Sequence, residues 1–69
     1  MRKKHPESPK YLQQAGIARS LEQEGRYMQA AEYWQLAITL ANRIGNMIWA
    51  ENRAAFCRHY GIRLQARKT

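Results

Sequence analysis

Apolar residues recur at three- and four-residue intervals in three stretches of this chain, and no stretch shows the strict alternation of a β-strand. The most regular stretch covers residues 25–41. On a helix with about 100° per residue, its alanines, Tyr27 and Trp34 fall on one face, and Tyr33, Leu36 and Leu40 form a flank beside it. This apolar surface is wider than the ~100° that packing against a single neighbour requires. The segment should therefore be covered from two sides.

Capping and breaking residues predict where the helices begin and end. Ser8 suits an N-cap with Pro9 at the first helical position, and Gly25 suits a left-handed C-terminal cap. Gly45 and Asn46 indicate a second break. We therefore predict a flexible basic arm over residues 1–8, a three-helix domain over 9–64 with helices at about 9–24, 27–43 and 47–62, and a basic tail over 65–69.

The predicted fold is all-α, a three-helix unit. Because only about two residues separate the first two helices, they should form an antiparallel hairpin, with the third helix added to it. Gly61, near the end of the third helix, is a candidate terminator. The expected core is Tyr11, Ala15, Ala18, Leu21, Tyr27, Ala30, Trp34, Ala37, Trp49, Phe56 and Cys57. Trp49 begins its helix and also suits an interface anchor.

The length of 69 residues allows one small domain, and domains of this size are marginally stable alone. The single cysteine, Cys57, excludes an internal disulfide, and Cys57 with His5 and His59 makes no convincing zinc set. Helix packing and association remain, so we expect a homodimer. The charged first ten residues do not resemble a signal peptide, and no stretch approaches the ~20 apolar residues of a membrane span. A cytoplasmic protein without membrane contacts is expected.

The net charge of +7 is carried by the two ends of the chain. Residues 1–10 carry four basic residues and one acidic residue, giving +3; residues 11–50 carry three of each, giving zero; residues 51–69 carry five basic residues and one acidic residue, giving +4. Basic ends can steer a protein towards nucleic acid or towards an acidic protein surface. They also keep a protein with an apolar centre in solution.

The residue types present do not favour catalysis. The chain has no aspartate. Of its two serines, Ser8 suits a helix cap, and Ser20 lies within a predicted helix with no histidine nearby in the sequence. The glutamates, Glu22 among them, have the pattern of solvated helix charges. Cys57 on an apolar face is typical of a small buried hydrophobe rather than of a reactive thiol. We expect no enzyme activity, no cofactor and no metal.

A protein partner is the more natural expectation. If the third helix leaves the flank of the second helix open, its tyrosine–leucine stripe marks a binding surface, and a thin isoleucine stripe on the third helix adds to it. The candidate partner-binding residues are Tyr33, Leu36, Leu40, Ile48 and Ile62. The other possibility is that the third helix covers the flank.

Two resemblances add to this reading. The spacing of Leu21, Gly25, Tyr27, Ala30, Tyr33 and Ala37 resembles one tetratricopeptide-repeat hairpin, although a second repeat and the closing proline are missing. Over nearly the whole chain, the sequence resembles the ANR family, the AraC negative regulators of Gram-negative bacteria. The motifs AAEYW and NMIWAENRAAFC carry much of that likeness, together with Tyr11, Ala15, Ala18, Leu21, Glu22, Gly25, Tyr27, Ala37 and Ala41.

The ANR resemblance implies a small cytoplasmic antiactivator. Members of that family bind AraC/XylS-type transcription activators directly and weaken their action, often on virulence genes, so the implied partner is such an activator. The alternative is a basic helical regulator that binds DNA itself. Direct binding to nucleic acid is possible but not favoured, because the polar residues that the third helix would offer to a groove do not share one face. They are Asn52, Arg53, Arg58, His59 and Arg63.

Overall fold

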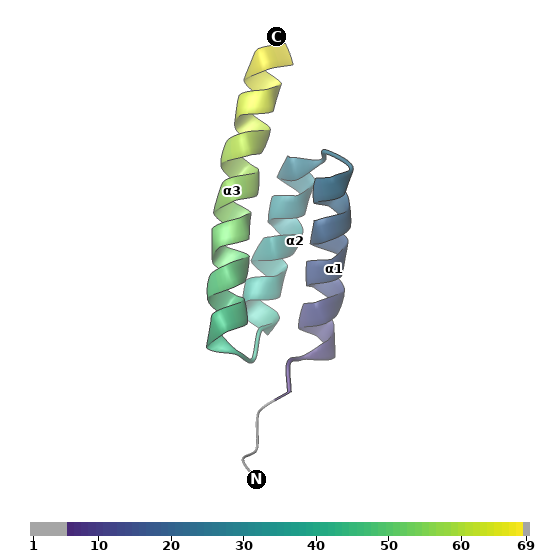
Figure 1. Ribbon diagram of the computed structural model, residues 1–69, viewed down its shortest axis with the longest axis vertical. Coiled ribbons are helices and arrows are strands. Elements are labelled where there is room, and N and C mark those ends of the chain that lie inside the picture. The colour runs from purple at the N-terminus through teal and green to yellow at the C-terminus, as the bar shows by residue number, and fades with distance from the viewer. Residues whose placement is uncertain (1–5, 69) are drawn as a thin grey trace.

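The computed structural model describes residues 6–68, which form three helices and no strand. These are α1 (Pro9–Gln23), α2 (Tyr27–Leu40) and α3 (Ile44–Lys68). Helix α2 lies in the middle, packs against both of the others and runs antiparallel to each (Figure 1). The predicted all-α, three-helix fold is confirmed.

Both ends of α1 follow from local sequence. The Ser8 hydroxyl accepts hydrogen bonds from the backbone N–H groups of Lys10 and Tyr11, with Pro9 at the start of the helix. At the other end Gly25 has a φ of 83°, the left-handed conformation that glycine adopts without steric cost. The Arg26 N–H then donates to the Leu21 carbonyl at 2.8 Å, which closes a Schellman motif.

The break between α2 and α3 lies at residues 41–43, not at Gly45 and Asn46 as predicted. A distant residue stabilises this break. The Glu7 carboxylate accepts hydrogen bonds from the backbone N–H groups of Asn42 (2.7 Å) and Arg43 (3.3 Å) and from Asn46 Nδ2 (2.8 Å). Because Glu7 satisfies donors just before the first turn of α3, that helix can begin earlier than its own capping residues indicate.

The same contacts correct the predicted N-terminal arm. Asn42 Nδ2 also donates to the Pro6 carbonyl at 3.3 Å, so Pro6 and Glu7 are both hydrogen-bonded to the α2–α3 junction. Residues 1–5 of that predicted arm lie outside the described residues. Burial acts to raise the pKa of Glu7, but hydrogen bonds from three backbone N–H groups and from Asn46 together outweigh it, so the pKa is lowered.

Helix α3 is longer than predicted and has no separate tail. Its 25 residues continue through Gly61 to Lys68, and its C-terminal part extends past the α1–α2 turn (Figure 1). Gly61 is buried in the helix rather than ending it. A Cβ at this position would lie 2.7 Å from Met28 Sδ and 3.2 Å from the Met28 backbone nitrogen. Glycine therefore allows close approach of α3 to α2. Residue 69 of the predicted tail lies outside the described residues.

Small side chains dominate the core. Its largest fully buried side chain is Trp34, which is 1% exposed and is surrounded by alanines from all three helices. Leu21 and Tyr27 are only partly buried and pack against this core. The buried residues are Tyr11, Ala15, Ala18, Ala30, Ala31, Trp34, Ala37, Ala50, Ala54 and Cys57.

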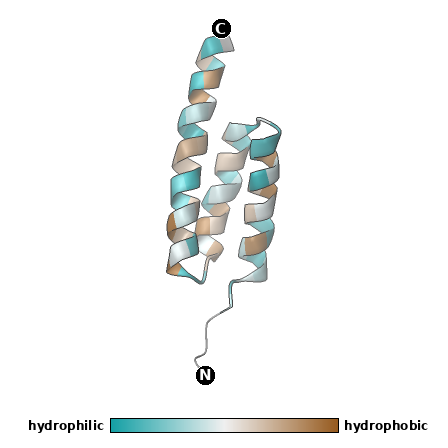
Figure 2. Ribbon diagram, viewed as in Figure 1, coloured by the Kyte–Doolittle hydropathy of each residue, from teal (hydrophilic) through white to brown (hydrophobic). Residues whose placement is uncertain are grey.

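The predicted core positions of Trp49 and Phe56 are wrong, since these side chains are 53% and 46% exposed. Helix α3 instead turns a row of small residues towards α2: Ala50, Ala54, Cys57 and Gly61 are all buried. Small residues let two helix backbones approach closely. The rings of Trp49 and Phe56 therefore lie beside the α2–α3 contact rather than in it. Along the ribbon of α3, hydrophobic and hydrophilic residues alternate (Figure 2).

Candidate functional site

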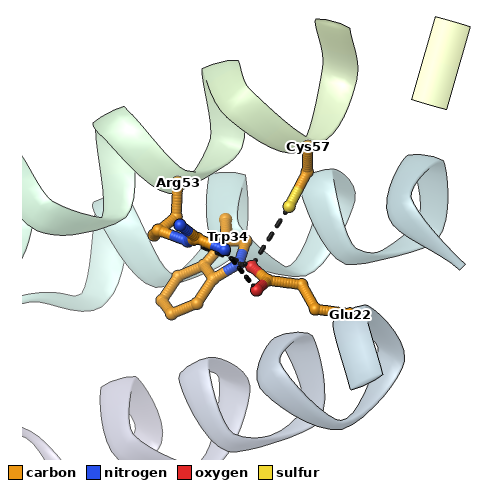
Figure 3. A network of polar contacts seen from close by, with 4 residues as sticks. All are labelled: Glu22, Trp34, Arg53 and Cys57. Atoms are coloured by element: carbon orange, nitrogen blue, oxygen red, sulfur yellow. Dashed lines mark hydrogen bonds and ion pairs between the residues drawn. The ribbon is translucent and has the colours of Figure 1, made fainter. Parts of the chain in front are cut away.

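A network of polar side chains joins the three helices beside Trp34. Glu22, near the end of α1, accepts hydrogen bonds from Trp34 Nε1 of α2 at 2.6 Å and from Cys57 Sγ of α3 at 3.1 Å (Figure 3). Arg53 of α3 completes the network, donating from Nη2 to Oε1 at 2.5 Å and from Nε to Oε2 at 3.3 Å. The prediction that Glu22 is an ordinary solvated charge is wrong. The Glu22 side chain is only 15% exposed and links α1 to α3 directly.

Opposing effects act on the pKa of Glu22. Burial alone would raise it, but the hydrogen bonds from Arg53, Cys57 and Trp34 and the positive charge of Arg53 outweigh burial, so the pKa is lowered. The pKa of Arg53 is raised, chiefly by its hydrogen bond to Glu22. Glu22 and Arg53 are therefore both ionised at neutral pH, and their charges neutralise each other.

Acid should destabilise the fold through Glu22 and Glu7. Both have a folded-state pKa below the ordinary 4.5, so their contribution to stability is complete above that value and is lost as the pH falls through the folded pKa. We expect the melting temperature, followed by circular dichroism, to stay level from pH 7 to about 5 and then to fall towards pH 3. A melting temperature that stayed level down to pH 3 would contradict the hydrogen bonding of both carboxylates.

Cys57 is not a nucleophile in this setting. Burial, followed by its hydrogen bond to Glu22 and the nearby carboxylate charge, raises the pKa of the thiol to about 12. The side chain is fully buried. A thiol attacks as thiolate, and very little thiolate forms at neutral pH under these conditions.

This setting gives a simple labelling prediction. Iodoacetamide at pH 8 should alkylate Cys57 much more slowly in the native protein than in the same protein unfolded in urea, measured by mass spectrometry. Alkylation should become faster when Glu22 is replaced by glutamine, because that change loosens the network around the thiol. Equal rates for native and unfolded wild-type protein would show that the thiol is accessible.

The structure divides the predicted partner-binding residues into two groups. Tyr33 and Leu40 are partly buried and pack against the core, so most of the flank of α2 is covered by the chain itself. Leu36, Ile48 and Ile62 are 50%, 49% and 51% exposed. Ile48 and Ile62 are 14 positions apart on α3, which is about 21 Å along a helix.

Sequence reasoning missed a second exposed surface, formed by rings on another side of α3. Phe56 and Tyr60 stack with their centroids 5.6 Å apart, and Tyr27 of α2 meets Tyr60 edge-on at 4.7 Å. The Arg53 guanidinium lies 4.6 Å from the Phe56 ring centre and 5.7 Å from that of Trp49. The small residues at positions 50, 54, 57 and 61 were the signal in the sequence. They mark the side of α3 that packs against α2, so the side that carries the rings stays outside the core.

An open pocket lies beside this surface, between α1 and α3. Its volume is about 510 Å³, and Trp34 and Glu22 form part of its wall with Trp49 and Arg53 of α3. Helix α1 contributes Arg19 and Gln23. The pocket brings one exposed tryptophan together with two arginines, of which Arg53 is already paired with Glu22.

Within residues 6–68, no group of three or more histidine, cysteine or acidic side chains is placed to hold a metal ion. None of the three helices, as far as they are described, is both long and apolar enough to cross a membrane.

No family model matches the chain, and no curated protein or solved structure shows significant similarity to it.

Proposed function

We propose that this protein is a small antiactivator that binds an AraC/XylS-family transcription activator directly and represses its activity by protein–protein contact. It acts in the cytoplasm as a homodimer, without a cofactor and without enzyme activity. The identity of the partner rests on the residues shared with the ANR family. The protein-binding role rests also on the surface of α3.

The observation that carries this proposal is the concentration of exposed apolar side chains on α3. Of the ten large hydrophobic residues found exposed in the described part of the chain, six belong to this helix: Ile44, Ile48, Trp49, Phe56, Tyr60 and Ile62. Helix α3 packs mainly against α2, which covers one side of it and leaves these residues in solvent. Exposed apolar side chains gathered on one helix of a small protein are typical of an interaction site.

The chemistry of the interior supports a binding role over catalysis. Glu22 accepts hydrogen bonds from Trp34, Arg53 and Cys57, and Cys57 is held by this bond to Glu22. This network links the three helices, and its one thiol, that of Cys57, is buried rather than exposed to solvent. The candidate contacts are the exposed side chains Leu36, Ile48 and Ile62 with the ring surface of α3.

A mass measurement in solution tests the proposal. We expect size-exclusion chromatography with light scattering to give a dimer for the protein alone and a larger complex when a purified AraC/XylS-family activator from the same cell is added. Expression of the protein should also lower transcription from a promoter that depends on that activator. If no complex forms and transcription is unchanged, the proposed function is wrong.

Direct DNA binding remains the alternative function, and the geometry does not favour it. Helices α1 and α2 form an antiparallel hairpin rather than the steeply crossed pair of a helix-turn-helix (Figure 1). Arg53, one of the residues that α3 would offer to a groove, is held by Glu22. Tight binding to random-sequence duplex DNA that weakens steeply with added salt would support this alternative over the antiactivator role.

A further inference from the structure

One line of side chains along α3 combines exposed rings with arginines. Its members follow one another at intervals of 4, 3, 4, 3 and 4 residues, which is the heptad spacing that keeps side chains on one line facing a neighbouring helix. The line covers 19 residues, whose ends are 18 positions apart, or about 27 Å along the helix. We call it the aromatic–arginine row, and it consists of Trp49, Arg53, Phe56, Tyr60, Arg63 and Arg67.

We propose that the aromatic–arginine row binds an amphipathic helix of a partner protein whose apolar stripe is flanked by glutamate or aspartate side chains. This inference rests on the protein-binding part of the proposed function and not on the identity of the activator. Three observations support it: the spacing of the row, its charge and the way its rings are held.

The spacing favours a helix as the partner. Heptad spacing produces a straight seam that a second helix can follow along its whole length. Pairing with an added strand would need the open edge of a sheet, and residues 6–68 contain no strand. Helix α3 also extends past the α1–α2 turn, which leaves its C-terminal part open for another helix (Figure 1).

The charge of the row requires acidic groups on the partner. The row has three arginines and no acidic residue, and Glu51, the only glutamate of α3, is outside it. Because Arg53 is paired with Glu22 of α1, the net positive charge of the row comes from Arg63 and Arg67. Pockets at both ends of the row repeat this bias. One contains Arg19 and Arg53 with the neutralising Glu22, and the other is lined by Tyr60, Arg63, Leu64, Ala66 and Arg67. A second copy of this chain would place its own Arg63 and Arg67 against this surface, so self-association at the row is disfavoured by like charge.

The rings are packed in a way that suits side chains better than nucleic-acid bases. Phe56 lies between Arg53 and Tyr60 along the helix. The Arg53 guanidinium lies over the Phe56 ring, and the Tyr60 ring stacks on Phe56. Tyr27 meets both rings edge-on and braces them from α2. With ring faces already in contact with neighbours, stacking of bases is hindered. Ring edges carry partial positive charge and attract carboxylates.

Two synthetic helical peptides test this inference. Both have three heptads with leucines at the seam; one has glutamates beside the seam and the other has lysines at the same places. Anisotropy of the labelled peptides should show that the glutamate peptide binds about tenfold more tightly than the lysine peptide, with weaker binding at higher salt. Equal affinity for the two peptides, or no binding of either, overturns the inference.

Charge-reversal variants locate the site. Replacing Arg63 and Arg67 by glutamate should weaken binding of the glutamate peptide by about tenfold and improve binding of the lysine peptide. The matched control, Lys10→Glu with Arg58→Glu, changes the net charge equally at exposed positions outside the row and should bind as wild type. An equal loss in both double variants would mean that only overall charge matters, and the inference would be wrong.

Ring variants separate the two apolar sides of α3. Trp49→Ser with Phe56→Ser should lose binding of the glutamate peptide, whereas Ile48→Ser with Ile62→Ser should retain it. The two pairs are matched in exposure, at 53% and 46% against 49% and 51%. Circular dichroism verifies that each variant is folded. Loss of binding in the isoleucine pair alone overturns the assignment to the row.

The same variants keep this inference separate from the proposed function. If an AraC/XylS-family activator binds wild type and Arg63→Glu/Arg67→Glu protein equally and the glutamate peptide does not bind, the inference is wrong and the proposed function stands. If the glutamate peptide binds and the activator does not, the proposed function is wrong and the inference stands. If single-stranded oligonucleotides bind the row more tightly than the peptide, the partner is nucleic acid and the inference is overturned.

Discussion

Replacing Trp34 by alanine is expected to lower the free energy of unfolding by about 3–5 kcal/mol, the cost of removing a large ring from a packed core. Trp34 is 1% exposed and is the largest fully buried side chain of the described residues. Its neighbours in the core are mostly alanines, which are too short to fill the cavity left behind. The change also removes the indole N–H that donates to Glu22 at 2.6 Å. Urea unfolding followed by circular dichroism measures the loss.

Two further tryptophan variants show where the loss comes from. Trp49→Ala removes an equally large ring that is 53% exposed and should cost about 1 kcal/mol or less, mainly through its contact with Arg53. Trp34→Phe keeps much of the ring volume but not the hydrogen bond, so its cost should lie between the two. A variant already unfolded in buffer would agree with the expectation for Trp34→Ala. An unchanged melting temperature would show that Trp34 does not hold the core together.

The sequence was sufficient for features that depend on nearby residues. Ser8, Pro9 and Gly25 act as the caps that their residue types predict, because a cap is made within a few positions of the chain. The hydrophobic spacing of residues 25–41 placed Trp34 in the core correctly. The all-α class follows from the same periodicity.

Features that depend on distant residues were not predictable in this way. Glu7 and Asn42 are 35 positions apart, yet their hydrogen bond stabilises the break before α3. Trp49 and Phe56 look like core residues by composition, but which side of α3 meets α2 is decided by the small residues at positions 50, 54, 57 and 61. Glu22 looks like any helix-surface glutamate until Trp34, Arg53 and Cys57 are brought to it.

In the candidate site, too, the spacing of residues is visible in the sequence, whereas their exposure depends on tertiary packing. The aromatic–arginine row has a regular spacing in the sequence, but its exposure follows only from the packing of α3. The predicted flank of α2 differs, since Tyr33 and Leu40 are partly buried against the core and Leu36 alone of that stripe stays exposed. Periodicity identifies apolar stripes on a helix, and tertiary packing decides which of them a partner can reach.

Glu22→Gln is expected to have the second large effect on stability, a loss of about 2–3 kcal/mol. Glutamine keeps the shape of the side chain but offers one acceptor oxygen and one donor group to a site where only donors converge. Trp34 Nε1, Cys57 Sγ and the Arg53 guanidinium all donate to the Glu22 carboxylate. The amide therefore leaves at least one donor without an acceptor and the charge of Arg53 without its partner.

Glu24→Gln is the matched control for this prediction. Glu24 lies two positions further along the chain and pairs with Arg26 at 3.4 Å, but the two side chains are about 60% exposed, so its loss should be at most about 0.5 kcal/mol. Glu22→Gln should also flatten the fall in melting temperature below pH 5, because it removes a carboxyl group whose pKa is lowered by folding. Equal losses for the two variants, with the acid sensitivity unchanged, would mean that Glu22 is an ordinary surface charge. The three helices would then be held together by apolar packing around Trp34 alone.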